Sequence, residues 1–298
     1  MAEAAAIRSA QQYLATVDRV LPGRVTGFYV VGSTALGAFV PGRSDIDFVA
    51  VVEADQGTDL GADELRRLRE VHVRSGLRTG AASVRRGWSP LAGTCNGVYL
   101  RRADLTTPVR EIVPLAGHIG HTFHVGAAAA GSDVSPVGWQ VLAERGIALR
   151  GEAPAALGLD PEPAALAAWN VENLDQYWRR WAAKVTRSPK RTFALRPRYW
   201  TSWGMLGAPR LHHTIATGNV ISKEAAGEHA LEVFPAQWHP LIEDALAYVR
   251  RRPNPGVHVD PAARATMTGA FVLHVAAAAD ELAASRAADA VGDVTPAG

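Results

Sequence analysis

The sequence has little cysteine and little lysine. Cys95 is the single cysteine among 298 residues, which excludes an internal disulfide and a zinc site built from several thiolates. Such sparing use of cysteine is typical of the reducing cytoplasm, where we expect the protein to be found. Lysine occurs three times against 28 arginines, and the formal net charge is only +2. This charge is too small to require nucleic acid, which we do not expect as a partner.

A long apolar run is also missing. Glu3 and Arg8 stand where a secretory signal would need apolar residues, and no stretch of about 18 uncharged apolar residues occurs. We therefore expect neither secretion nor a membrane partner. The chain does have 48% hydrophobic residues, which is ample for globular cores and, at this length, suits two domains.

The two halves of the chain differ in their patterns. Apolar segments typical of strands occur at 27–32, 46–52 and 97–102, mixed with helical patterns, whereas helical periodicity alone follows from about residue 156. Helices are predicted at 202–217, 223–233, 237–251 and 261–286, the last with Asp260 as its N-cap. We predict an α+β protein, with a mixed sheet and helices in a domain over 1–155 and an α-helical bundle over 156–298.

The segment VVGSTALGAFVPGRSDIDFVAVV is the most informative part of the chain. Asp45 and Asp47 stand two apart at the start of an apolar strand, so their side chains share one face while Ile46 and Phe48 face the core. Mg²⁺ prefers such carboxylates together with phosphate oxygens. Gly32 permits close approach of a ligand to the backbone, and Ser33 offers a hydroxyl and nearby N–H groups to an anion. The pattern predicts a cation site beside a phosphate cradle.

This segment resembles the nucleotidyltransferase superfamily that shares the polymerase β palm. The stretch from Ile215 to Tyr248 and the segment WQVLAERGIALRGEAP are in turn similar to the streptomycin and spectinomycin adenylyltransferases. The resemblance implies a palm-like nucleotidyltransferase domain followed by a helical domain. It also implies MgATP as cofactor and substrate, and transfer of AMP to a hydroxyl of a small sugar-like or antibiotic-like molecule, with release of pyrophosphate.

The resemblance also implies roles for single residues. Asp45 and Asp47 would be metal ligands, Gly32 and Ser33 would contact the nucleotide's phosphates, and Lys223 would reach the triphosphate from the helical domain. The residue pattern independently favours a phosphate contact for Lys223. Ser222 is a suitable helix N-cap, which places Lys223 in the first helical turn, and a cation there opposes the macrodipole unless an anion is bound.

The chain departs from the family at the implied catalytic base. The resembling enzymes have a third carboxylate on a later strand, and the alignment places Asn96 there. An amide does not accept a proton at neutral pH. Another group such as Asp104 could replace the base, the metal alone could activate the hydroxyl, or the protein could bind nucleotide without transferring it.

The acceptor side of the chain is rich in cations. Eight of them lie between Arg179 and Arg198 without an acid, where the resembling enzymes have acidic residues, so we expect a neutral or anionic acceptor and not a polycation. Weaker candidates for contact with the acceptor are Glu172, Asp175, Tyr177 and Trp178.

Two further patterns are compatible with functions other than adenylyl transfer. His118, His121 and His124 are spaced i, i+3, i+6, which could suit zinc ligands on a helix. Side chains at i and i+6 diverge on a helix, so these histidines are interpreted as structural residues. The arginine-rich segment could serve an RNA-directed nucleotidyltransferase, but it lacks the interleaved aromatic residues that stacking on bases requires.

Overall fold

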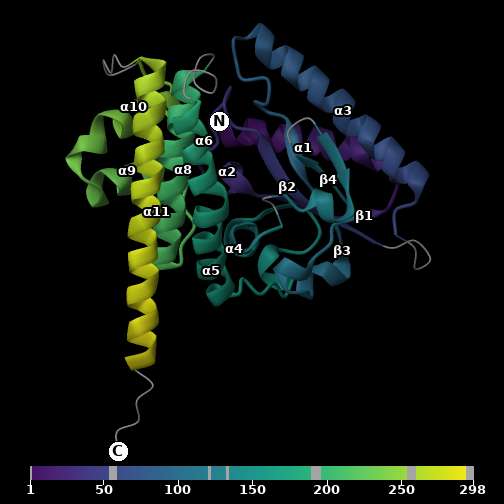
Figure 1. Ribbon diagram of the computed structural model, residues 1–298. Helices are drawn as coiled ribbons and strands as arrows, with labels where there is room; N and C mark the ends of the chain where they lie inside the picture. Colours follow the sequence, from purple (N-terminus) through teal and green to yellow (C-terminus); the bar gives the residue numbers. More distant parts are fainter. Residues whose placement is uncertain are drawn as a thin grey trace, which may run out of the picture. The chain divides into compact units, whose positions relative to one another are not determined.

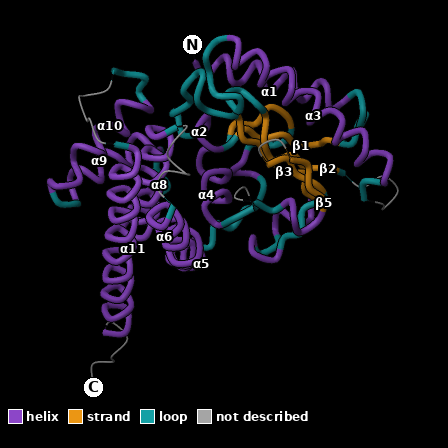
Figure 2. The backbone as a smooth tube through the Cα atoms, turned by 45° about the horizontal axis from the view of Figure 1, so that its top comes forward, coloured by secondary structure: helices purple, strands orange, loops and turns teal. Residues whose placement is uncertain are grey.

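The structure is a computed structural model of the 298-residue chain. It describes residues 2–53, 59–119, 122–131, 134–188, 196–253 and 260–292. The chain divides into two compact units, Met1–Glu162 and Pro163–Gly298. The sequence placed this division between residues 155 and 156. All strands of the described chain belong to the first unit and the second is helical, as Figure 2 shows by colour, so the predicted α+β class is confirmed.

The first unit is built on a six-stranded mixed sheet in the order β5-β4-β3-β2-β1-β6. Strands β1 to β4 of this sheet are labelled in Figure 1. The strands are β1 (Val25–Val30), β2 (Ile46–Val52), β3 (Cys95–Arg101), β4 (Ala116–Ile119), β5 (Thr122–Val125) and β6 (Ile147–Arg150). Strands β2 and β3 are parallel, and the other neighbours are antiparallel. The bounds predicted for β2 are confirmed, whereas the four-residue strands β4, β5 and β6 were not predicted.

Helices α1 (Ala2–Asp18) and α3 (Ala62–Arg85) pack on one face of this sheet. Alternate residues of β2, including Ile46 and Phe48, point into the core beneath these helices, as predicted. Asp47 lies between them in the strand and therefore faces the opposite side. Successive side chains of β2 thus alternate between the apolar core and the polar face of the sheet. Short helices α2 (Gly32–Ala35) and α4 (Pro136–Arg145) also belong to the unit, together with four short 3-10 helices.

The second unit is a bundle of helices around a core of leucine, alanine and aromatic side chains. Its helices are α5 (Pro163–Asn173), α6 (Arg180–Arg187), α8 (Pro197–Thr217), α9 (Lys223–Val233), α10 (His239–Val249) and α11 (Pro261–Gly292). The predicted caps are confirmed. Ser222 Oγ accepts from Ala225 N at 3.2 Å, and Asp260 Oδ1 accepts from Ala262 N at 2.8 Å.

A π-helical turn, η5 (Leu174–Arg179), joins α5 to α6. It includes Asp175, Tyr177 and Trp178, three of the four residues that the sequence indicated as acceptor contacts. Because a π-helical turn adds a residue to the helix, it changes which side chains share a face. The helical period of 3.6 residues therefore does not hold through this turn.

Helix α11 is the one helix of the described chain that is long and apolar enough, over Pro261–Arg286, to cross a membrane. Phe271, Val272 and Val275 on this helix are fully buried in the core of the second unit. The helix packs against α8 and α6 of the same unit. Packing within the bundle thus accounts for part of its apolar character, since 39% of its most apolar window is buried.

Candidate active site

Asp45 and Asp47 lie at the N-terminal end of β2, on the face of the sheet away from α1 and α3. Asp45 stands one residue before the strand, and Asp47 is its second residue. Both side chains are partly exposed. The backbone of this segment is anchored by hydrogen bonds, from Ile46 N to Thr94 O and from Val31 N to Asp47 O, each 2.9 Å long. The two carboxylates are therefore held on ordered backbone.

Gly32 brings the backbone of α2 directly against Asp47. Its φ is +60°, and a Cβ at this position would lie 1.9 Å from Asp47 Oδ2. An alanine there would both strain the backbone and collide with the carboxylate. The sequence predicted that Gly32 permits close approach to the backbone. The structure shows that the group in close contact with Gly32 is the Asp47 carboxylate.

Ser33 and Asn96 each leave a buried oxygen without a partner. Ser33 Oγ, in α2, and Asn96 Oδ1, in β3, have no hydrogen-bond partner among the described residues. Buried polar atoms are nearly always satisfied, so two orphaned oxygens beside a carboxylate pair indicate a place where a ligand supplies the missing contacts.

Asn96 lies beside the two carboxylates. It is paired in register with Asp47 across the parallel strands β2 and β3, and its side-chain nitrogen Nδ2 donates to Asp45 Oδ2 at 2.7 Å. The side chain is 6% exposed. The structure therefore brings together Gly32, Ser33, Asp45, Asp47 and Asn96, all from the first unit.

Cys95, next to Asn96, is no nucleophile at this site. Burial, with the nearby charges of Asp47 and Asp45, raises the pKa of its thiol to about 12. The thiol therefore stays protonated at neutral pH, and a protonated thiol reacts poorly.

The residues present fit a divalent cation. The site offers two carboxylates and an orphaned amide oxygen, which are the hard oxygen ligands that Mg²⁺ accepts. Within the described ranges, no group of three or more His, Cys, Asp or Glu side chains is placed to hold a metal ion. The described residues thus offer two carboxylates and one amide oxygen, and any further oxygen ligands would come from water or from a bound molecule.

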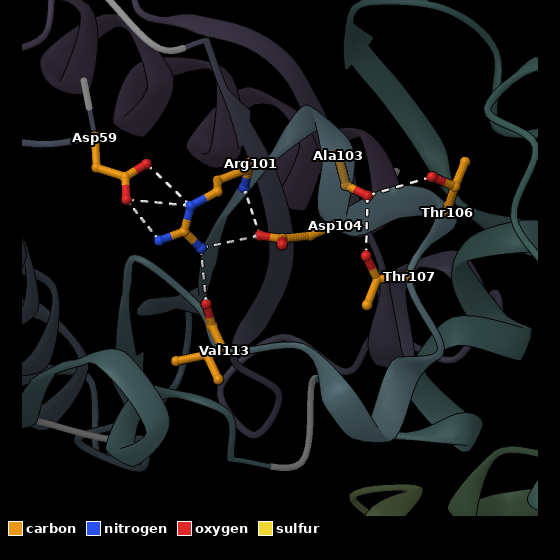
Figure 3. A network of polar contacts seen from close by, with 7 residues as sticks. All are labelled: Asp59, Arg101, Ala103, Asp104, Thr106, Thr107 and Val113. Atoms are coloured by element: carbon orange, nitrogen blue, oxygen red, sulfur yellow. Dashed lines mark hydrogen bonds and ion pairs between the residues drawn. The ribbon is translucent and has the colours of Figure 1, made fainter. Parts of the chain in front are cut away.

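Asp104, the sequence's candidate for a replacement base, is at the other end of β3. Asn96 is near the start of this strand and Arg101 ends it, a separation of five residues or about 16 Å at the usual rise. Asp104 Oδ2 accepts from Arg101 N at 2.8 Å, and the Arg101 guanidinium lies between Asp104 and Asp59 (Figure 3). Asp104 is therefore a structural acceptor and is too far from Asp45 to act as a base there.

Lys223 is exposed at the first turn of α9, in the second unit. Its Nζ lies 5.1 Å from the centroid of the Trp203 ring on α8. Trp203 Nε1 in turn donates to Tyr177 Oη at 3.1 Å. The sequence did not predict this link between Lys223 and the π-helical turn, because the three residues are far apart in the chain and only the packing of α8 joins them.

The four acceptor candidates differ in exposure and partners. Trp178 is 5% exposed and its ring packs against Gly207, where a Cβ would lie 2.1 Å away, so it belongs to the core. Tyr177 is 42% exposed. Glu172 accepts from Gln176 Nε2 at 3.0 Å, and Asp175 is 3.6 Å from the Arg179 guanidinium. Asp175 and Tyr177 are therefore the exposed candidates, and Tyr177 is the aromatic one of the two.

Two of the described cations in the segment from Arg179 to Arg198 are paired with acids. Arg179 pairs with Asp175 and Asp280, and Arg198 pairs with the fully buried Asp244, which also pairs with Arg264. Arg180, Lys184, Arg187 and Arg196 are exposed, while Lys190 and Arg191 lie outside the described residues. The cationic surface is therefore smaller than the sequence indicated.

His118 and His124 are on the neighbouring strands β4 and β5, so their spacing is not helical. His121 lies outside the described residues. His118 is buried, and its Nδ1 is 3.0 Å from Cys95 O. Its ring lies 4.5 Å from that of His72, whose pKa is lowered well below its ordinary value by burial and by His118. These contacts are those of histidines within a core.

Family models match both halves of the chain. A nucleotidyltransferase domain matches residues 12–79, which include Gly32, Ser33, Asp45 and Asp47. The C-terminal domain of aminoglycoside adenylyltransferases matches residues 167–273, which include Lys223. No curated protein matches the chain.

Among solved structures, the chain is similar to spectinomycin adenyltransferase AAD(9) from Enterococcus faecialis, crystallised with ATP and spectinomycin. The sequence identity is 13%, the TM-score is 0.58, and the similarity covers 90% of this chain and 99% of that one. At this identity the likeness concerns the fold. The two family models follow one another along the sequence, and the fold agrees with them. Together they show that the chain is an aminoglycoside adenylyltransferase-like nucleotidyltransferase.

Proposed function

We propose that the protein transfers AMP from MgATP to a hydroxyl of a small molecule and releases pyrophosphate. The observation that carries the proposal is the group formed by Ser33, Asp45, Asp47 and Asn96 around Gly32, which holds two carboxylates and two orphaned oxygens. Support for ATP comes from the similar AAD(9) structure, which was determined with ATP and spectinomycin.

In this proposal Asp45 and Asp47 hold a divalent cation, which when bound would neutralise charge on the phosphates. Ser33 Oγ, buried and unpartnered in the described structure, donates to a phosphate oxygen. Gly32 keeps the Asp47 carboxylate in place because any side chain there would displace it. Lys223 adds a cation for the triphosphate from the second unit.

Asn96 contributes no proton acceptor, so general-base catalysis by this residue is not part of the proposed reaction. The hydroxyl would then lose its proton to solvent or to a carboxylate already at the site. This departure favours a second candidate function, a protein that binds nucleotide without transferring it. We expect transfer, but at a rate without the contribution of a dedicated base, which is typically about 10² to 10⁴-fold.

The acceptor is proposed to be sugar-like or antibiotic-like and not a polycation. Arg180, Lys184, Arg187 and Arg196 are exposed and would repel one. Because Arg179 and Arg198 are already paired with acids, the repulsion is weaker than eight unpaired cations would produce.

Pyrophosphate release measured over a panel of acceptors tests the proposal. The panel contains spectinomycin and streptomycin, neutral sugars and sugar phosphates, each with MgATP and with the other nucleoside triphosphates. Turnover of a neutral or anionic acceptor supports the full proposal, and turnover of the aminoglycosides corrects its acceptor class. MgATP binding without pyrophosphate release from any acceptor would favour the second candidate function.

A further inference from the structure

Helix α3 is apolar on two faces. Leu68 and Val71, on its inner face, are buried in the core of the first unit. The outer face has Val73, Leu77 and Val84, which are 40%, 67% and 59% exposed. The outer face of a surface helix is normally polar, and exposed apolar side chains need no explanation only when they are scattered singly. The sheet therefore accounts for the inner apolar face of α3 and not for the outer one.

The three exposed residues form one row along α3, which we call the outer stripe. Val73, Leu77 and Val84 are spaced i, i+4 and i+11, so at about 100° per residue they fall within about 40° of one another around the helix. Figures 1 and 2 both show α3 at the periphery of the first unit. A row of aliphatic side chains on such a helix forms a ridge, and ridges of this kind pack into the groove of a second helix.

A row of arginines borders the outer stripe. Arg74, Arg78 and Arg85 each directly follow one of its residues, so this arginine row has the same spacing and lies along one side of the stripe. All three side chains are exposed. Arg74 lies 3.8 Å from Glu70, whereas the sequence from residue 71 to residue 103 has no aspartate or glutamate. The acids of α3 therefore lie only toward its N-terminal end, and the outer stripe has a cationic border.

The charge of this face limits what can cover it. A second copy of the chain that docked through the same face would bring the two arginine rows together without an acid to separate them, and like charges at a contact oppose binding. A lipid surface needs more apolar area than three partly exposed aliphatic side chains, and none of the three is an aromatic anchor. A helix that carries acids beside its own apolar face matches both rows.

We propose that α3 docks an acidic amphipathic helix of a partner protein, with the apolar face of that helix on the outer stripe and its carboxylates on the arginine row. Exposed ion pairs are individually weak and are screened by salt, so the contact should be of moderate affinity and sensitive to ionic strength. The surface is separate from the candidate active site, because Asp47 lies on the face of the sheet away from α3. The proposal can therefore be tested without any transfer reaction.

Binding of two synthetic peptides to the full-length protein, followed by fluorescence anisotropy, tests the charge and the shape of the partner. The first peptide is an amphipathic helix with leucines along one face and glutamates on both flanks, and the second has lysine in place of every glutamate. Wild-type protein is expected to bind the glutamate peptide at least about 10-fold more tightly, the sum of a few exposed ion pairs, and less tightly as salt is raised. Equal affinity for the two peptides, or no binding of either, would overturn the proposal.

Leu77→Gln and Arg78→Glu test the two rows separately. Both side chains are exposed, so each variant should keep the melting temperature of wild type. Leu77→Gln should bind the glutamate peptide about 10-fold more weakly, because an apolar side chain no longer becomes buried on binding. Arg78→Glu should lose the preference for glutamate and bind the lysine peptide more tightly than wild type does. Leu273→Gln and Arg180→Glu, at an exposed leucine and an exposed arginine of the second unit, are the matched controls and should bind both peptides as wild type does.

Wild-type affinity in Leu77→Gln, or equal losses in Arg78→Glu and Arg180→Glu, would show that the peptide is attracted by charge anywhere on the surface and would overturn the proposal. Two further measurements examine the other occupants. Sedimentation equilibrium detects a dimer, and cosedimentation with vesicles of phosphatidylcholine and phosphatidylglycerol detects lipid binding. A dimer that Leu77→Gln abolishes would assign the outer stripe to a second copy, and vesicle binding that the same variant abolishes would assign it to a membrane. Either result would also overturn the proposal.

Discussion

The amide nitrogen of Asn96 lies 2.7 Å from Oδ2 of Asp45, joining β3 to the residue that precedes β2. The contact places a neutral side chain where the family resemblance implies a third carboxylate. It also keeps Asp45 from turning away, because a charge-assisted hydrogen bond to a carboxylate is among the stronger polar contacts in proteins.

Asn96→Glu is expected to raise the rate of nucleotidyl transfer by about 10² to 10⁴-fold, the usual contribution of a general base. The glutamate would place a proton acceptor beside Asp45 and Asp47. Single-turnover pyrophosphate release measures the rate. Asp104→Asn should leave it unchanged, because Asp104 is bound to Arg101 at the far end of β3 (Figure 3). An unchanged rate in Asn96→Glu together with loss of activity in Asp104→Asn would contradict this assignment.

Gly32→Ala is expected to destabilise the protein and to weaken cation binding. The positive φ alone costs about 1 to 2 kcal/mol for a residue with a Cβ, and the collision with Asp47 Oδ2 adds an overpacking cost of about 1 to 3 kcal/mol. Gly37→Ala is the matched control, because Gly37 has a φ of +68° with nothing within 4 Å of its Cβ position. Urea unfolding should show the smaller loss for Gly37→Ala, with cation binding intact. Equal losses in both variants would show that Asp47 simply moves aside.

Asp47→Ala is expected to abolish cation-dependent nucleotide binding and to leave the fold intact. Asp47 faces away from the core that contains Ile46 and Phe48, so its removal creates no cavity there. Titration calorimetry with MgATP should show an affinity lower by at least about 100-fold, since even supporting groups of metal sites account for 10 to 100-fold. Asp59→Ala, which removes a carboxylate paired with Arg101, should bind normally. Wild-type affinity in Asp47→Ala would remove Asp47 from the cation site.

Lys223→Ala is expected to weaken nucleotide binding by about 1 to 2 kcal/mol, the value of one charge-assisted contact to phosphate. The loss of the cation above Trp203 should also change tryptophan fluorescence in the nucleotide-free protein. Lys184→Ala, at another exposed lysine of the second unit, should do neither. An unchanged dissociation constant with altered fluorescence would show that Lys223 only covers the Trp203 ring.

The unfolding free energy of the second unit is expected to fall as pH is lowered from about 6.5 toward 4. His212 Nδ1 and His229 Nε2 are 3.1 Å apart, and His213 lies against His229. Burial, with His229 and His213, lowers the pKa of His212 to about 4, against about 6.5 in the unfolded chain. Between these values the unfolded state binds more protons, so acid favours unfolding, and above 6.5 the effect vanishes.

Urea unfolding followed by tryptophan fluorescence measures this pH dependence, since six of the eight tryptophans belong to the second unit. His212→Phe keeps an aromatic ring against Phe234 and removes one titrating group, so its unfolding free energy should change less between pH 7 and pH 5. A slope equal to that of wild type would mean that His212 does not titrate in this window.

The sequence alone was sufficient for features that depend on neighbours in the chain. The alternation of Ile46 and Phe48 with Asp47 predicted which face of β2 is buried, and Ser222 and Asp260 predicted helix starts, because pleating and capping are set within a few residues. The bounds of β2 and α9 followed from the same local patterns.

Tertiary structure decided whatever depends on contacts between distant segments. Strands β4, β5 and β6 have only four residues each, too few for a period to show, and exist because neighbouring strands pair with them. Only the parallel register of β2 and β3 could place Asn96 against Asp45, and the same register leaves Asp104 far from both residues. Only the packing of α8 could bring Trp203 to Lys223. Hydrogen bonds and ring contacts of this kind join residues many positions apart, so patterns among neighbouring residues cannot predict them.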